Sequence, residues 1–209
     1  MSKTQILIAG HGGQGILLLG DYIAYTALRD GKNVAYTPSY GPETRGGKAK
    51  CYVIVSDEEV DNPIAEEPDV ELIMNLPSMD FLAGLRPGGL LVYNSSLANE
   101  GVDREDIRVI GVPATEIAEQ LRTEPPAEGY GDTKMFANTV MFGVFLEACA
   151  PLTAEAAIEA TLQHFIASKG GQLMELNRLA LRRGRDFAVK NPPVRKTWQF
   201  SRVPSWAAQ

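Results

Sequence analysis

The sequence Gln-Ile-Leu-Ile-Ala-Gly-His-Gly-Gly-Gln-Gly at residues 5–15 decides the fold. Residues 5–9 form a short apolar run that ends at a glycine, which is the pattern of a strand buried on both faces. Apolar residues then recur at helical spacing from Ile16 to Leu28, and Gly31 is the expected C-terminal stop. A second strand is expected at 33–37. The sequence therefore predicts a β-α-β opening, for which parallel pairing of the two strands is favoured.

The rest of the chain continues this alternation and then becomes helical. Strands are expected at 49–56, 70–75, 89–94 and 107–111, short helices at 77–85 and 113–121, and three longer helices at 135–148, 153–167 and 171–189. The run 49–56 follows its predecessor with no room for a crossover helix, so we expect it either to be antiparallel to its neighbour or to form a separate ribbon. We predict a Rossmann-like α/β fold with a mixed, mostly parallel sheet flanked by helices and a helical C-terminal third. Residues 1–190 would form a single domain and residues 191–209 an extended arm rich in aromatic residues and proline.

Composition limits the class of protein. A chain of 209 residues with 44% hydrophobic and 22% charged residues is long enough for one sizeable core. No apolar run approaches the length of a membrane span, so we expect a cytoplasmic protein with no membrane contact. The two cysteines, Cys51 and Cys149, are not in a C-x-x-C pair, which disfavours a disulfide framework, a cysteine-bound zinc and an iron–sulfur cluster on this chain.

The net charge of −6 is distributed unevenly along the chain. Nine basic and two acidic residues lie after residue 168, so this segment carries +7 and the first 168 residues carry −13. Such asymmetry occurs in nucleic-acid-binding tails, in surfaces that contact acidic partners and in solvated helix faces. The segment has no recognisable nucleic-acid reader motif, so we expect no nucleic-acid partner and favour a solvated helix face.

The glycine-rich turn has the spacing Gly10-x-Gly12-x-x-Gly15 between a strand and a helix. Glycines in this position permit a tight turn and let backbone N–H groups approach a phosphate, but they also serve close packing of a helix on a strand. The acidic residue that would hold a ribose at the end of the second strand is replaced by Pro-Ser-Tyr at 38–40, which counts against NAD or FAD. Anion contact and pure turn geometry both remain open.

A second loop, Pro-Ser-Tyr-Gly-Pro-Glu-Thr-Arg-Gly-Gly at 38–47, carries one arginine between rigid punctuating residues. The guanidinium of Arg45 suits a planar carboxylate or phosphate, and Gly46 and Gly47 would let a ligand or another chain come close. The alternative is a local ion pair between Glu43 and Arg45. A loop so dense in Gly, Pro, Tyr and Arg favours the binding role.

Few other side chains suggest chemistry. Asn138 lies in an apolar segment, where a buried amide is satisfied either by local backbone or by something bound at the start of the helix. His11 and His164 have no partners at metal-ligand spacing, so we expect no metal site. No nucleophile elbow, Walker lysine or H-E-x-x-H motif is present, and we expect no catalytic residue in this chain.

The two loops and Asn138 together resemble the gamma subunit of 2-oxoacid:ferredoxin oxidoreductases, the enzymes of pyruvate, 2-oxoglutarate and 2-ketoisovalerate. The resemblance rests on residues 8–16, on Tyr-Gly-Pro-Glu-x-Arg-Gly-Gly within 38–47, on Cys-Tyr-Val-Ile-Val-Ser-Asp at 51–57, and on Asn138 with Gly143, and it extends over residues 5 to about 190. It implies a subunit that is not catalytic alone, within a complex that converts a 2-oxoacid to an acyl-CoA and reduces ferredoxin. The binding residues it implies are Gly10, Gly12, Gly13, Gln14, Gly15, Tyr40, Glu43, Arg45, Gly46, Gly47 and Asn138.

The resemblance also implies partners and a ligand. Thiamine diphosphate and iron–sulfur clusters would belong to partner subunits: alpha, beta and, in some complexes, a delta or ferredoxin-like subunit. Coenzyme A is the ligand to which this chain would contribute, with Arg45 facing either a coenzyme A phosphate or an acidic residue of the alpha subunit. The alternatives are a beta-type subunit of indolepyruvate:ferredoxin oxidoreductase, a stand-alone nucleotide- or anion-binding module, and a purely structural scaffold. The isolated chain is compatible with a homodimer.

Overall fold

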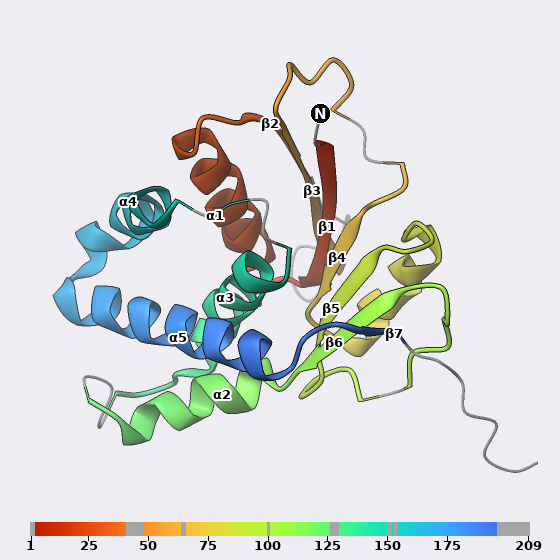
Figure 1. Ribbon diagram of the computed structural model, residues 1–209. Helices are drawn as coiled ribbons and strands as arrows, with labels where there is room; N and C mark the ends of the chain where they lie inside the picture. Colours follow the sequence, from red (N-terminus) through yellow and green to blue (C-terminus); the bar gives the residue numbers. More distant parts are fainter. Residues whose placement is uncertain are drawn as a thin grey trace, which may run out of the picture.

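The computed structural model describes residues 3–40, 48–63, 66–99, 101–125, 130–149, 152 and 154–195. A single sheet divides the molecule, with helices α1 to α5 on one side and η1 on the other (Figure 1). The elements, in chain order, are β1 (Lys3–His11), α1 (Ile16–Arg29), β2 (Asn33–Tyr40), β3 (Lys48–Ser56), β4 (Val70–Ile73), η1 (Leu76–Gly84), β5 (Leu90–Asn94), β6 (Arg108–Val112), α2 (Ala114–Gln120), η2 (Leu121–Thr123), η3 (Lys134–Phe136), α3 (Ala137–Cys149), α4 (Glu155–Ile166), η4 (Ala167–Lys169), α5 (Gly171–Lys190) and β7 (Val194–Arg195).

The sheet has the strand order β2-β3-β1-β4-β5-β6-β7. β1, β4, β5 and β6 pair parallel, whereas β3 pairs antiparallel with both β1 and β2, and β7 pairs antiparallel with β6. Five strands therefore share one direction, which confirms the mixed, mostly parallel α/β fold. The predicted antiparallel pairing of residues 49–56 is also confirmed. The predicted parallel pairing of the first two strands is wrong, because β3 is inserted between them.

The larger core lies between the sheet and the helices. Ile6 and Ile8 of β1 point into it, together with alternate residues of β3 and the apolar faces of α1, α3, α4 and α5. Gly20 lets α1 approach the sheet closely, since a Cβ there would meet Cys51 Sγ at 2.6 Å and Tyr36 Cε2 at 2.9 Å. The helical periodicity of residues 16–28 therefore marks the face that packs on β2 and β3.

A smaller core lies on the other face of the sheet. Ala9, Ile73, Leu91 and Val109 come from four adjacent strands, and Leu85, Val102 and Ile107 come from the connections that cover them. The one polar side chain on this face of β4 is Glu71, which is fully buried between Leu7 and Leu91 of the neighbouring strands. Both of its carboxylate oxygens lack a hydrogen-bond partner among the described residues.

Helices α3 and α5 cross in very close contact through two glycines. A Cβ on Gly143 would meet the Leu181 carbonyl oxygen at 2.2 Å, and a Cβ on Gly184 would meet the Val140 carbonyl oxygen at 2.0 Å. No other residue type fits at either position without separating the helices. Gly143, singled out in the sequence together with Asn138, therefore has a packing role.

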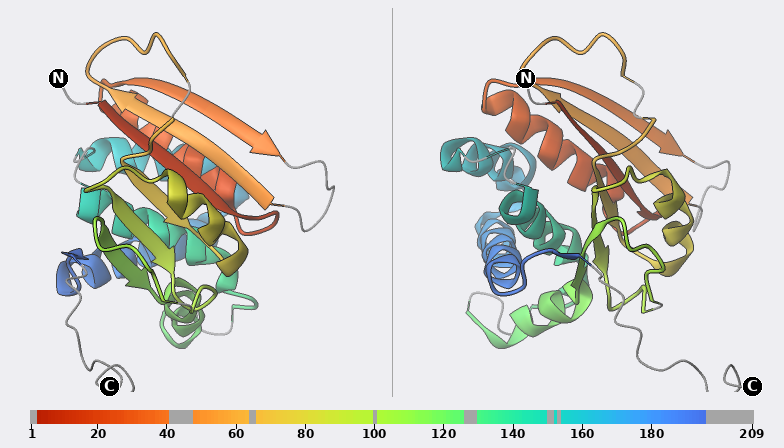
Figure 2. Two further views of the ribbon diagram at one scale, coloured as in Figure 1. Left: turned by 90° about the vertical axis from the view of Figure 1, so that its right-hand side faces the viewer. Right: turned by 45° about the vertical axis from the view of Figure 1, so that its right-hand side comes forward.

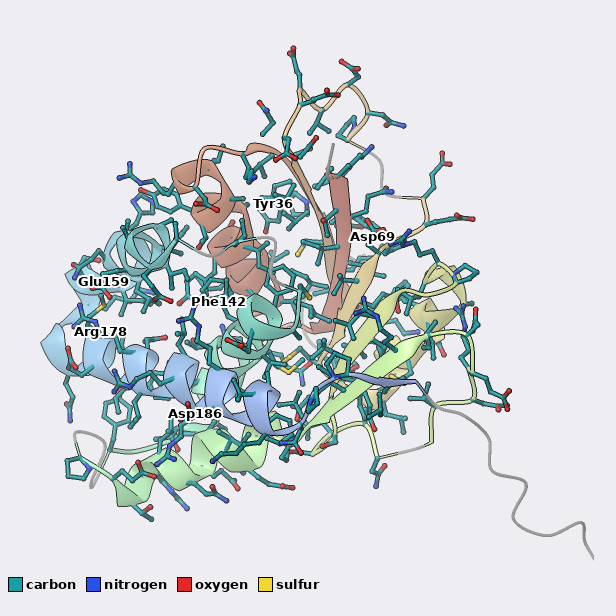
Figure 3. All side chains as sticks on the ribbon, viewed as in Figure 1. Tyr36, Asp69, Phe142, Glu159, Arg178 and Asp186 are labelled. Atoms are coloured by element: carbon teal, nitrogen blue, oxygen red, sulfur yellow. The ribbon has the colours of Figure 1, made fainter. Side chains whose placement is uncertain are left out.

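The basic residues of α5 are largely paired within the chain. Arg178 forms ion pairs with Glu159 of α4 and Glu175 of α5, and Figure 3 shows Glu159 and Arg178 pointing toward one another. Arg183 pairs with Glu124 and Arg185 with Glu155. The positive C-terminal charge thus neutralises acidic residues that precede it, which agrees with a solvated helix face.

The predicted C-terminal arm is described only at its start. Val194–Arg195 form β7 beside β6, and residues 196–209, including the aromatic residues of the predicted arm, lie outside the described residues. Among the helices that the structure describes, none is both long and apolar enough to cross a membrane.

Candidate functional site

Gln14 holds the glycine-rich turn between β1 and α1. Its Oε1 accepts hydrogen bonds from the His11 backbone N–H at 2.7 Å and from Asn75 Nδ2 at 2.9 Å. Its Nε2 donates to the Met74 carbonyl oxygen at 3.3 Å, so the turn is tied to the residues that follow β4. A side chain predicted to contact a ligand is thus committed to shaping the turn.

The glycines of the turn have separable roles. Gly13 and Gly15 have φ angles of 98° and 70°, which lie in the region that disfavours any residue with a Cβ. Gly10 is needed for packing, because a Cβ there would meet Ile16 Cδ1 at 2.5 Å and Met74 Cβ at 2.9 Å. Gly12 is exposed, and a Cβ on it would meet no neighbouring atom within 4 Å. Turn geometry therefore explains Gly13 and Gly15, packing explains Gly10, and Gly12 is left without either role.

Asn138 lies directly against the turn. A Cβ on Gly15 would meet Asn138 Nδ2 at 2.4 Å, so the first turn of α3 packs on the N-terminus of α1. Asn138 is 4% exposed, and its Oδ1 accepts a hydrogen bond from the Thr139 backbone N–H at 2.8 Å. Thr139 Oγ1 in turn donates to Asn177 Oδ1 at 2.9 Å. The sequence placed Gly15 and Asn138 far apart, and the fold brings them into contact.

A crevice of about 330 Å³ opens beside this contact, outside the carboxyl ends of the parallel strands. Asn94 ends β5, and its Nδ2 donates a hydrogen bond of 2.9 Å to Thr115 Oγ1 at the start of α2. Leu97 and Met135 are largely exposed and supply an apolar wall. The full lining is Gly13, Gln14, Met74, Asn94, Leu97, Thr115, Asp132, Lys134, Met135 and Ala137.

The crevice favours an anionic or polar group at its inner end. Helices α1 and α3 begin at its rim, and the first N–H groups of a helix have no acceptor within the helix. Lys134 contributes an ammonium group that is paired with Glu119 at 2.9 Å, and this hydrogen bond raises the pKa of Lys134. Asp132 is the one carboxylate among the described lining residues. The site therefore combines helix N-termini, one lysine, one carboxylate and an apolar wall.

The second predicted loop starts at the same edge of the sheet. Tyr40, the last residue of β2, pairs with Ala49, which also pairs with Gly10, and Lys48 pairs with His11. Glu43, Arg45, Gly46 and Gly47 lie outside the described residues, as does the side chain of Tyr40. The ends of β2 and β3 that flank this loop thus lie at the same edge of the sheet as the glycine turn, and the role predicted for Arg45 stays a prediction.

Sequence reasoning missed most of the crevice lining. Met74, Asn94 and Thr115 each lie at or just after the end of a parallel strand, which is where ligands bind in open α/β sheets. The polar residues Asn94 and Thr115 were readable from the predicted strand ends. Lys134 and Met135 come from a loop that packs there only in three dimensions, and no local pattern marks them.

A mostly parallel sheet with a crevice at its carboxyl edge and a glycine turn opening α1 is an α/β architecture in which ligands commonly bind at that edge. The chain belongs to the pyruvate ferredoxin/flavodoxin oxidoreductase family, whose model matches residues 5–187.

Individual relatives differ in length. The 2-oxoglutarate synthase subunit KorC of Methanothermobacter thermautotrophicus is 32% identical over 195 residues, covering 90% of this chain and 96% of KorC. The ketoisovalerate oxidoreductase subunit VorA of Methanothermobacter marburgensis is 35% identical over 190 residues, and this chain spans only 37% of its length. A solved 2-oxoglutarate:ferredoxin oxidoreductase from Magnetococcus marinus, with 2-oxoglutarate, coenzyme A and succinyl-CoA bound, superposes with a TM-score of 0.81 at 22% identity, over 94% of this chain and 32% of that one. This last match shows the same fold.

Proposed function

We propose that this chain is the gamma-type subunit of a 2-oxoacid:ferredoxin oxidoreductase and that its crevice holds part of coenzyme A. The observation that carries the proposal is the match to KorC, which extends over nearly all of both chains. This relative is a subunit of a 2-oxoglutarate synthase, which supports a subunit role for this chain. The complex would oxidise a 2-oxoacid to an acyl-CoA and pass the electrons to ferredoxin.

The chemistry of the crevice suits coenzyme A. Its phosphates are anionic groups of the kind that helix N-termini and lysine side chains attract. Its pantetheine arm contains both apolar carbon segments and polar amide groups, and the apolar segments suit the wall formed by Leu97 and Met135. A cavity of about 330 Å³ is at the lower end of the size range of small-molecule sites, so coenzyme A would extend beyond it toward solvent or a partner subunit. The Magnetococcus marinus enzyme, part of which has the same fold as this chain, was solved with coenzyme A and succinyl-CoA bound.

Thiamine diphosphate and the iron–sulfur clusters would be held by alpha, beta and ferredoxin-like partner subunits. Within the described residues, no group of three or more His, Cys, Asp or Glu side chains could hold a metal ion. Burial raises the pKa of the Cys51 and Cys149 thiols to about 12, which disfavours the thiolate form that ligates iron. The chain's own part would be to bind coenzyme A and to contact its partners.

The comparisons do not favour the alternative functions. The relatives are subunits of 2-oxoglutarate and ketoisovalerate oxidoreductases, which does not favour an indolepyruvate enzyme. A stand-alone dinucleotide module is disfavoured because Gln14 closes the glycine turn with internal hydrogen bonds to His11 and Asn75.

The test is steady-state kinetics of the complex purified through a tag on this chain, with Lys134→Ala compared to the wild type. Removing one charged contact of a bound phosphate should raise the KM for coenzyme A by about tenfold, equivalent to about 1.4 kcal/mol, with the KM for the 2-oxoacid unchanged. Lys190→Ala, an exposed lysine at the far end of α5, is the matched control. An unchanged KM for coenzyme A in Lys134→Ala would show that the crevice is not the coenzyme A site.

A further inference from the structure

One face of the sheet carries lysine and aromatic side chains that are not part of the crevice. Along β3, Lys48, Lys50 and Tyr52 alternate with Ala49, Cys51 and Val53, which face the helix-side core. Side chains alternate along a strand, so the two lysines and Tyr52 point away from the helices. Figure 2, left, looks onto this face, where β1, β2 and β3 lie in front of α1.

Lys50 is held in place by rings rather than by a carboxylate. Its Nζ lies 4.9 Å from the centre of the Phe81 ring and 5.4 Å from the centre of the Tyr52 ring. It also donates a long hydrogen bond of 3.4 Å to Tyr52 Oη. Lys50 is half-buried and forms no ion pair among the described residues. Aromatic faces attract an ammonium group but leave its charge uncompensated.

Two further side chains, Lys48 and His11, lie on the same surface. Lys48 Nζ lies 5.9 Å from the centre of the same Phe81 ring and pairs with Asp80 at 2.5 Å. His11 lies opposite Lys48 in the strand register and two residues after Ala9, so it points to the same face. The Nδ1 atom of His11 is buried and has no hydrogen-bond partner in the described part of the chain. We name Lys48, Lys50, His11, Tyr52 and Phe81 the lysine face.

The longer relatives indicate what covers such a face. This chain matches only 37% of VorA, so in that relative the equivalent domain is joined to a much larger remainder. In a complex built from separate subunits, the corresponding polypeptide must bind through a surface of this chain. The helix side is closed by α1, α3, α4 and α5, whereas on the opposite side of the sheet the structure describes only the short 3-10 helix η1, which contributes Asp80 and Phe81 (Figures 1 and 2).

We propose that the lysine face docks an acidic segment of the partner subunit that corresponds to this remainder, with partner carboxylates on Lys50 and Lys48. The inference rests on the proposed function, because it requires that partner to exist. Charge complementarity selects the occupant: among the described residues this face has two lysines and the carboxylate of Asp80, which pairs with Lys48, so Lys50 is left without an acidic partner in a chain whose net charge is −6.

The test uses the complex recovered through a tag on this chain and treated with a water-soluble carbodiimide, which joins an amine to a carboxylate only when the two are in contact. Mass spectrometry should find Lys50 or Lys48 joined to an Asp or Glu of the partner subunit. Cross-links to the partner that come only from other lysines, such as Lys169 or Lys190 on the helix side, would overturn the proposal.

The second measurement follows the dissociation of the complex as NaCl is raised. The Lys50→Gln variant should bind the partner subunit with an affinity about fivefold weaker than that of the wild type. The double variant Lys48→Gln/Lys50→Gln should bind it more weakly still. Lys32→Gln, which removes a surface lysine paired with Asp57, is the control. Equal affinity of the double variant and the wild type would refute the docking site. If the wild-type chain recovers no partner that oxidises a 2-oxoacid and reduces ferredoxin, the proposed function fails as well. If the active complex is recovered but the lysine variants bind the partner as tightly as the wild type does, the docking site alone fails.

Discussion

Replacing Glu71 with Gln should change how the stability of the protein depends on pH. Glu71 is fully buried on β4, and neither of its carboxylate oxygens has a hydrogen-bond partner in the described residues. Burial raises the pKa of Glu71 from 4.5 to about 8, and attraction to the Arg104 guanidinium opposes this only in part. Arg104 is occupied elsewhere, since it binds both carboxylate oxygens of Asp106 and donates to the carbonyl oxygens of Leu82 and Leu85.

The sign of the effect follows from proton binding. Between pH 4.5 and about 8 the folded state keeps the Glu71 proton while the unfolded state loses it, so the free energy of unfolding falls as pH rises through this window. Each pH unit costs up to about 1.4 kcal/mol, which gives about 3 kcal/mol at pH 7 relative to pH 4.5. Gln has the shape of the protonated acid and no charge to bury. The stability of Glu71→Gln relative to the wild type should therefore increase with pH.

The assay is urea unfolding followed by circular dichroism at pH 5, 6, 7 and 8 for the wild type and Glu71→Gln. Glu147→Gln, which removes an exposed carboxylate on α3, is the matched control, and its difference from the wild type should stay small throughout. A Glu71→Gln difference that is constant between pH 5 and pH 8 would refute the reasoning, because it would mean that Glu71 has the same proton affinity in the folded and unfolded states.

Two glycines and one arginine give three further tests by the same unfolding assay. Gly184→Ala would place a Cβ 2.0 Å from the Val140 carbonyl oxygen and should lower the free energy of unfolding by about 3 kcal/mol. Gly171→Ala, at the open start of α5, should leave the free energy of unfolding unchanged. Equal effects of the two substitutions would contradict the close crossing of α3 and α5. Gly15→Ala combines a φ of 70° with a contact of 2.4 Å to Asn138 Nδ2 and should cost about 2 kcal/mol, while Gly12→Ala should be tolerated; a neutral Gly15→Ala would argue against the packing of α3 on the turn. Arg178→Gln removes ion pairs to Glu159 and Glu175 and should cost no more than about 1 kcal/mol, with a smaller loss at high salt; a loss of several kcal/mol would mean that the pair is not a surface contact.

The elements could be predicted from the sequence, but their arrangement could be predicted only in part. The apolar run at residues 5–9, the glycine turn and the periodicity of 16–28 identified β1 and α1 because these signals are local. The short spacing before 49–56 correctly indicated an antiparallel strand. Its position between β1 and β2 was not predictable in this way, because strand order depends on contacts between residues far apart in the chain.

The candidate site shows the same division. Gly13, Gln14, Gly15 and Asn138 were singled out from local patterns; the structure places Gly13 and Gln14 in the lining of the crevice and Gly15 against Asn138 beside it. Gln14 is committed to hydrogen bonds with His11, Met74 and Asn75, which depend on where β4 ends and could not be read from the turn itself. Lys134 reaches the crevice from a segment more than one hundred residues away. The burial of Glu71 also depends on residues distant in the chain, because the connections that contribute Leu85, Val102 and Ile107 cover that face of the sheet.

The antiparallel return of β3 between β1 and β2 affects how the protein can evolve. The segment 41–47 joins two paired strands whose register is fixed from Asn33–Ser56 to Tyr40–Ala49, so residues inserted or exchanged there leave the order of all seven strands unaltered. The crevice is built from the ends of other strands. Changes in segment 41–47 during evolution can therefore leave both the strand order and the lining of the crevice as they are.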